Sequence, residues 1–219
     1  MLNKILITFA LLLFFPFSLV YAQNISMALK ASTLGVGLEA EKTFTDSFGG
    51  RIGINYFTYD DTWTKDDIDY NYDLNLLSVS ALLDWHPFKG SFRISGGALY
   101  NGNDIDMDAK TAATYQIGDT TYTSANIGNL TGNVDFNDIA PYLGIGWDTT
   151  FGKSKKFGFL LELGAIYQGT PKVDLSISGP LSGDQALQND LQAEEDSLQE
   201  DLDNFEYYPV LAVGFNYRY

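Results

Sequence analysis

The sequence contains no cysteine, and this absence excludes disulfide bonds, thiolate metal sites and a lipid anchor on an N-terminal Cys. A histidine-rich metal centre is not expected either, because His86 is the one histidine of the chain. Basic residues are few: 13 Lys and Arg stand against 28 Asp and Glu, which gives a formal net charge of −15. A surface of this sign repels a phosphate backbone, so we predict no nucleic-acid partner.

Long hydrophobic runs are absent beyond the N-terminus, because charged or strongly polar residues interrupt every later apolar segment. A mature chain of this kind can enter a membrane only as a β-barrel, which satisfies its backbone groups in lipid. At the N-terminus, Lys4 precedes an uncharged apolar run, and Ala22 supplies the small residue of a cleavage site. We predict a secretory signal peptide over residues 1–22 and a mature domain over residues 23–219. A retained anchor is the alternative, which Pro16 and the shortness of the run disfavour.

Aromatic residues and glycine are abundant, with 14 Tyr, 15 Phe and 21 Gly. In the last segment, the odd positions from Tyr207 to Tyr219 are apolar or aromatic, whereas the even positions from Ala212 to Arg218 are small or polar. A period of two with one apolar face is typical of a barrel strand that faces lipid on one side and a polar lumen on the other. The same alternation recurs in four earlier segments, at residues 51–56, 92–101, 139–147 and 157–164.

Changes of parity and the lengths of the connections predict the topology. The apolar set switches parity between Leu76 and Leu77, which predicts a β-bulge, and near Ser32, which splits residues 24–44 into two strands. Short connections lie near residues 45–47, 86–91 and 150–156, and long ones at residues 60–69, 109–135 and 179–205. Short periplasmic turns and long external loops are the rule for outer-membrane barrels. We therefore predict an all-β fold, a closed antiparallel transmembrane β-barrel of eight strands.

The long connection near the C-terminus has a helical pattern. Residues 182–205 place Leu187, Leu191 and later leucines on one helical face, and Ser182 with Gln185 fits a capping box. We predict one amphipathic helix inserted in a long external loop, with its leucine stripe covering the barrel mouth. A periplasmic position for this helix is the alternative.

The inward positions of the predicted strands collect charges of both signs. These residues are Glu39, Glu41, Arg51, Asp84, Arg93, Glu162 and Arg218. An eight-stranded barrel has an interior just wide enough for side chains. Because an unpaired charge in such a space is costly, we predict that these groups pair across the lumen and block it. The alternative is a narrow ion or proton pathway lined by the same groups.

Two other groups of residues could carry chemistry. Asp104, Asp106 and Asp108 alternate along one strand, and their oxygens suit hard divalent cations, but the spacing of an EF-hand loop is absent. Hydrolysis by a Ser–His pair would have to use His86, which lies on a predicted periplasmic turn, away from the external rim. We predict no metal site, no cofactor, no catalytic residue and no enzymatic activity.

The chain ends with an aromatic residue, and Phe215, Tyr217 and Tyr219 share the lipid-facing side of the last strand. With the signal peptide, the alternating strands and the absence of Cys, this ending resembles the small outer-membrane barrel families related to OmpA, OmpX and OmpW. The resemblance implies a monomer in the outer membrane of a Gram-negative bacterium, in contact with outer-membrane lipids and lipopolysaccharide. It also implies that the barrel-assembly machinery recognises the three aromatic residues as an assembly signal.

Three functions are compatible with these features. The first is a non-enzymatic outer-membrane barrel with a structural, envelope or surface-interaction role. The second is a narrow channel for small solutes, including hydrophobic ones. The third, a soluble periplasmic β-sandwich or lipocalin-like carrier, would bury the aromatic residues inside and leaves Tyr219 and the alternating loop lengths unexplained.

Overall fold

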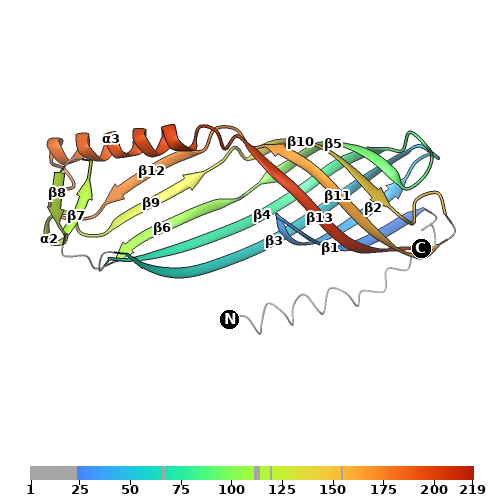
Figure 1. Ribbon diagram of the computed structural model, residues 1–219, viewed down its shortest axis with the longest axis horizontal. Helices are drawn as coiled ribbons and strands as arrows, with labels where there is room; N and C mark the ends of the chain where they lie inside the picture. Colours follow the sequence, from blue (N-terminus) through green and yellow to red (C-terminus); the bar gives the residue numbers. More distant parts are fainter. Residues whose placement is uncertain (1–23, 66–67, 111–113, 119, 154) are drawn as a thin grey trace.

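Eight strands form a closed antiparallel barrel in the computed structural model of the protein (Figure 1). The structure describes residues 24–219 except 66, 67, 111–113, 119 and 154, so the predicted signal peptide lies outside the described residues. The barrel strands are β1 (Ile25–Ser32), β2 (Gly35–Thr43), β3 (Phe48–Lys65), β4 (Ile68–Trp85), β5 (Phe92–Asn101), β10 (Ile139–Asp148), β11 (Phe157–Tyr167) and β13 (Tyr207–Arg218). Because β13 pairs with both β1 and β11, and β5 pairs with both β4 and β10, the ring is closed. The predicted fold class and strand number are confirmed.

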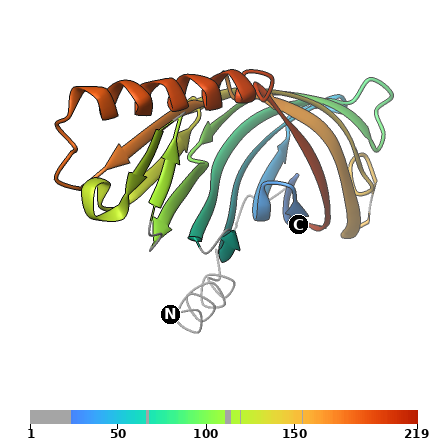
Figure 2. The ribbon, with the colours of Figure 1, turned by 60° about the vertical axis from the view of Figure 1, so that its left-hand side comes forward.

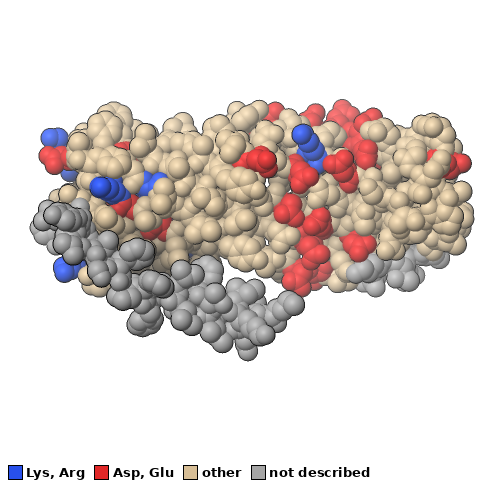
Figure 3. Space-filling view, turned by 180° about the vertical axis from the view of Figure 1, so that it is seen from behind, with Lys and Arg blue, Asp and Glu red and all other residues tan. Residues whose placement is uncertain are grey.

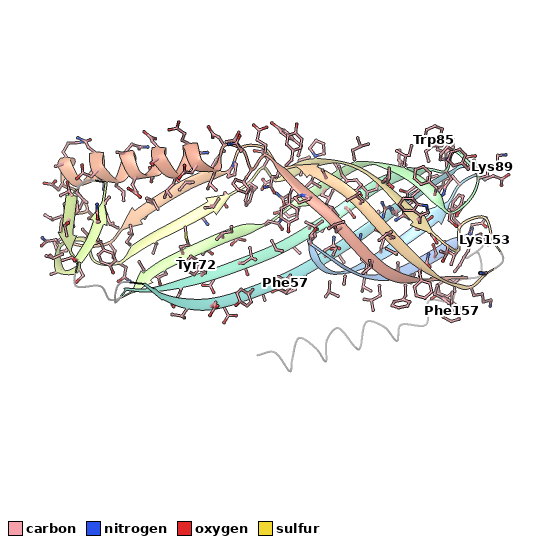
Figure 4. The ribbon with its side chains drawn as sticks, in the orientation of Figure 1. Phe57, Tyr72, Trp85, Lys89, Lys153 and Phe157 are labelled. Atoms are coloured by element: carbon pink, nitrogen blue, oxygen red, sulfur yellow. The ribbon has the colours of Figure 1, made fainter. Side chains whose placement is uncertain are left out.

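The outer surface of the ring is an apolar band bounded by aromatic side chains. Along β13, Leu211 and Val213 are exposed, whereas Val210 and Ala212 are buried. Exposed aromatic residues form a ring at each end of the band. Near the end that holds Asn24 and Tyr219 they are Phe48, Trp85 and Phe157, and toward the other end they are Tyr56, Tyr100 and Tyr207. Figure 4 shows Trp85 and Phe157 at the first of these ends. An apolar band between two aromatic girdles is the surface that a barrel in a bilayer requires.

The parity change near Ser32 is a tight turn between β1 and β2, so residues 24–44 hold two strands, as predicted. Gly35 follows the turn with a φ of +101°, a conformation that other residues rarely adopt. The side chain of Leu34 is 3% exposed because the turn folds over the lumen and packs there.

On one side, the barrel wall continues well beyond the ring (Figures 1 and 2). The distal part of β4 pairs with β6 (Asp104–Lys110), which is followed in the sheet by β9 (Leu130–Asp135) and β12 (Lys172–Ile177). A ribbon of β7 (Thr114–Ile117) and β8 (Thr120–Thr123), and the helices α2 (Ser124–Ile127) and α3 (Gln185–Leu202), complete this region. We call it, together with the distal halves of β3 and β4, the outer extension. The expected loop at residues 60–69 is therefore mostly strand.

The parity change between Leu76 and Leu77 is not a β-bulge, and that prediction is wrong. β4 pairs with β3 without interruption, and its register with β5 continues unchanged into β6. What changes is the apolar face of the strand. Leu77 and Val79 point outward and are exposed, whereas Leu76 is buried and points inward.

Beyond Leu76, the outward positions of the sheet become polar. Asp73 lies directly between Asp60 and Asp106 in one cross-strand row, while Ile105 and its neighbours line the inner face. On the barrel side of this point the outward side chains are apolar, as lipid requires. On the side of the outer extension they are polar, as water requires. The parity change therefore marks the place where β4 leaves the apolar band.

Helix α3 confirms the predicted amphipathic helix but not its cap. Asp184 is the N-cap, and its carboxylate accepts hydrogen bonds from the backbone N–H groups of Ala186 and Leu187. The expected capping box of Ser182 and Gln185 is wrong, because Gln185 is already the first helical residue. Leucines of α3 pack into the apolar cluster of the outer extension, so the helix covers that region instead of the barrel mouth. Within the described part of the chain, no helix is long and apolar enough to cross a membrane.

Candidate functional site: the barrel lumen

Arg51 of β3 lies at the centre of an ionic network inside the barrel. Its Nη1 atom is 3.1 Å from Glu39 Oε2 on β2 and 2.5 Å from Glu162 Oε2 on β11. Its Nε atom is 3.0 Å from Asp84 Oδ2 on β4, and its Nη2 atom donates a hydrogen bond to Ser95 Oγ on β5 at 3.1 Å. All five side chains are buried, because each occupies an inward position of its strand.

Three further groups extend the network around the carboxylates. Lys30 Nζ of β1 is 2.9 Å from Glu39 Oε2, and Arg93 Nη2 of β5 is 3.0 Å from Glu162 Oε2. The hydroxyl of Tyr142 on β10 donates a hydrogen bond to Glu162. Glu162 therefore accepts from groups on three other strands, which fixes its position across the width of the lumen.

The charges of the network nearly balance. It contains three cations and four carboxylates, namely Lys30, Arg51, Arg93, Glu39, Glu41, Asp84 and Glu162. Glu41 is held less closely than the others, with Arg93 Nη1 at 3.7 Å. Desolvated ions are tolerated inside a protein only where opposite charges and hydrogen bonds surround them, and this arrangement supplies both.

The structure brings six of the seven predicted lumen residues together and places the seventh elsewhere. Arg218 lies at the rim, where it donates hydrogen bonds to the carbonyl oxygen of Thr150 at 3.2 Å and to Thr43 Oγ1 at 3.1 Å. Lys30 is a member that sequence analysis missed. It occupies an even position in β1, between apolar Leu29 and Ala31, and this alternation could have identified it as inward-facing.

Two further layers of side chains fill the lumen above and below the ionic network. Toward the outer extension, a buried apolar cluster contains Leu34, Leu82, Leu99, Ala140, Tyr142, Ile166 and Val210. Toward the end of the barrel that holds Asn24 and Tyr219, the rings of His86 and Phe151 stack with centroids 3.3 Å apart. At the same level, Asn216 Nδ2 donates to Asp148 Oδ1 at 2.5 Å. Side chains therefore occlude the lumen at three levels.

The other residues considered for chemistry lie outside this network. Asp104, Asp106 and Asp108 are in β6 of the outer extension. Across the described residues, no group of three or more Asp, Glu or His side chains is arranged to hold a metal ion. His86 is fully buried, with its Nδ1 atom 2.8 Å from the carbonyl oxygen of Gly90.

A closed ring of eight antiparallel strands, with apolar side chains outside and paired charges inside, defines a small transmembrane β-barrel. The chain is similar to two solved structures from Acinetobacter baumannii. CarO2 shares 26% identity with a TM-score of 0.57, over 90% of this chain and 99% of that one. CarO shares 27% identity with a TM-score of 0.54, over 89% and 97%. The chain is thus a small outer-membrane β-barrel protein of the Gram-negative type.

Other comparisons add little to this assignment. The N-terminal β-barrel domain of Pseudomonas aeruginosa OprF aligns with 13% identity and a TM-score of 0.33, over 89% of this chain and 98% of that domain. No protein-family model matches the sequence, and no curated protein is significantly similar to it.

Proposed function

We propose that this protein is a closed, non-enzymatic barrel with a structural role in the outer membrane and that its outer extension provides a surface for contacts. The observation that carries the proposal is the occlusion of the lumen. The ionic network alone joins residues from β1 to β5 and from β11, and the apolar cluster lies directly above it. A solute would have to break several buried ion pairs to pass, which is strongly unfavourable.

The same proposal includes the environment of the barrel. The apolar band and its girdles suit a monomer surrounded by outer-membrane lipids and lipopolysaccharide, after export with cleavage of the signal peptide. The aromatic side chains of Phe215, Tyr217 and Tyr219 contact one another or rings of β11 along the last strand, where the barrel-assembly machinery would recognise them.

Single-channel recording in planar bilayers tests the closed barrel. Purified protein is first shown to be folded by heat-modifiable migration in gels. We expect no discrete conductance from the folded protein. The double variant Arg51→Ala with Glu162→Ala removes two facing partners of the ionic network and is expected to stay closed as well, because the apolar cluster and the stacked rings of His86 and Phe151 still fill the lumen. A porin recorded in the same bilayers verifies that the assay detects an open lumen. Discrete steps from the unaltered protein would instead support the narrow channel for small solutes.

A further inference from the structure

The end of the barrel that holds Asn24, Tyr219 and the short turns is basic. Its Lys and Arg side chains are Lys42, Lys89, Lys153, Lys155, Lys156 and Arg218, and Asp46 is the one acidic residue of the three turns. Figure 3 shows the opposite distribution over the outer extension, where Asp and Glu gather. Short turns mark the periplasmic end of outer-membrane barrels, so this basic rim faces the phospholipid headgroups of the periplasmic leaflet.

Lys42 differs from the other residues of the basic rim because it projects from the lipid-facing side of a strand. It is an exposed residue of β2 that alternates with buried Glu41 and lies directly opposite Gly50 of β3. Within the described residues, no carboxylate lies within ion-pair distance of its ammonium group. A lysine at the edge of a bilayer extends toward the headgroups, and its counter-ion has to come from outside the protein.

A groove on the lipid-facing surface begins at Lys42. It has a volume of about 580 Å³ and crosses β2 to β5, with Ala40, Gly50, Ala81 and Gly96 among its lining residues. The groove exists because small residues occupy neighbouring outward positions: Lys42, Gly50 and Gly96 share one cross-strand row through Leu83, and Ala40 and Ala81 share the next through Ile52. The ring of Phe44 packs over Gly50, so that an added Cβ there would lie 2.8 Å from its Cζ atom.

We propose that this groove binds an anionic phospholipid of the periplasmic leaflet, with one acyl chain along the small residues and the phosphate on Lys42. The two halves of the site match the two halves of the ligand. The groove is lined chiefly by carbon atoms, as an acyl chain requires, and the unpaired ammonium lies at the level of the headgroups. The remaining cations of the basic rim favour a lipid with net negative charge over a zwitterionic one.

Native mass spectrometry of the folded barrel tests this site. The protein is reconstituted in bicelles that contain phosphatidylglycerol and phosphatidylcholine, released, and scored for retained lipid. Lys42→Gln removes the phosphate ligand, and Lys156→Gln removes one charge from the far wall of the same rim as a matched control. Gly96→Leu fills the groove, since an added Cβ at Gly96 meets no atom nearer than the carbonyl oxygen of Tyr142 at 3.9 Å. Heat-modifiable migration verifies that each variant is folded.

The unaltered barrel is expected to retain phosphatidylglycerol in preference to phosphatidylcholine. Loss of one charge-assisted contact should lower the apparent affinity of Lys42→Gln by about tenfold. Gly96→Leu should lower retention comparably, and Lys156→Gln should behave as the unaltered protein. Equal losses from Lys42→Gln and Lys156→Gln would overturn the site in favour of general attraction by the basic rim. Retention that survives both Lys42→Gln and Gly96→Leu, or a second copy of the chain in place of lipid, would also overturn it.

Discussion

At the scale of single residues, the guanidinium of Arg51 is removed from water and held by Glu39, Asp84 and Glu162. Desolvating a cation costs several kcal/mol, and the cost is offset only while the partners keep their geometry. The three carboxylates depend on the arginine in the same way, because they stay desolvated and lose this partner if it is removed. The stability of the ionic network therefore depends strongly on this one residue.

We expect Arg51→Met to destabilise the folded barrel by about 3–5 kcal/mol, since it leaves carboxylates buried without their main cation. Lys153→Met, which removes an exposed charge of the basic rim, is the control and should change stability little. The measurement is urea unfolding of the protein in lipid vesicles. Equal midpoints for the two variants would contradict the central role of Arg51.

The outer extension contains a second residue pair with a measurable consequence. The hydroxyl of Tyr122 donates a hydrogen bond to Asp190 Oδ2 of α3 at 2.6 Å, and this bond lowers the pKa of Asp190 below its ordinary value. Because the folded-state pKa is lowered, the contact stabilises α3 above about pH 4 and is lost as the pH falls through the folded-state pKa.

An NMR titration of the Asp190 carboxyl group measures this effect. We expect Tyr122→Phe to raise the pKa of Asp190 toward the ordinary value, because it removes the hydrogen bond that stabilises the ionised carboxylate. An unchanged titration in Tyr122→Phe would show that the hydrogen bond does not form in solution.

At the scale of elements, β4 has two environments along one uninterrupted strand. Its outward side chains are apolar from Leu77 to Trp85 and polar at Asp73 and Asn75. The inward side chains of the same strand change in the opposite sense, because the lumen is ionic whereas the outer extension has an apolar core. The change of residue type along β4 therefore indicates where the strand crosses the membrane boundary.

Cysteine labelling locates this boundary, and the chain is suited to it because it contains no native Cys. We expect Asp73→Cys to react on intact cells with a membrane-impermeant maleimide, because that position faces water. Val79→Cys, six residues further along the strand on the same face and within the apolar band, should stay unlabelled until the membrane is dissolved. Equal rates for the two positions would place the boundary elsewhere.

Helix α3 is held by few buried side chains, of which Leu187 is fully buried and Leu191 nearly so. We expect Leu187→Ala to cost about 2–5 kcal/mol of local stability and to speed proteolysis and hydrogen exchange in the outer extension. Leu198→Ala, at a half-buried position of the same helix, should have a smaller effect. Heat-modifiable migration should be unchanged in both, because α3 does not contact the ionic network; a lost shift would show that the barrel depends on the helix.

At the scale of the whole molecule, the last strand closes the ring by pairing with the first. The backbone N–H of Tyr219 donates to the carbonyl oxygen of Ile25 at 3.0 Å, and its ring lies against that of Tyr217. The end of β13 thus closes the ring by pairing with β1, and it also carries the proposed assembly signal.

The two roles separate in one experiment. We expect Tyr219→Ala to lower the yield of folded barrel in cells severalfold and to leave spontaneous folding into vesicles unaffected, because the backbone hydrogen bond is kept. Tyr207→Ala removes another exposed aromatic side chain, at the other end of β13, and should leave the yield intact. A similar fall in yield for both variants would assign the effect to the aromatic girdles in general.

The sequence by itself determined that this chain forms an eight-stranded barrel, because the period-two alternation states directly which side of each strand faces lipid. It also determined the helix of the outer extension, whose leucines recur at helical spacing. Only the tertiary structure decided which charges meet: Lys30 joins the network, whereas Arg218 remains at the rim. The parity of a position shows that its side chain points inward but does not give its position along the barrel axis. That position depends on the tilt and register of all eight strands. For the same reason, a parity change at Leu76 and Leu77 has two local explanations, and only the unbroken pairing on both sides of β4 separates a change of surroundings from a bulge.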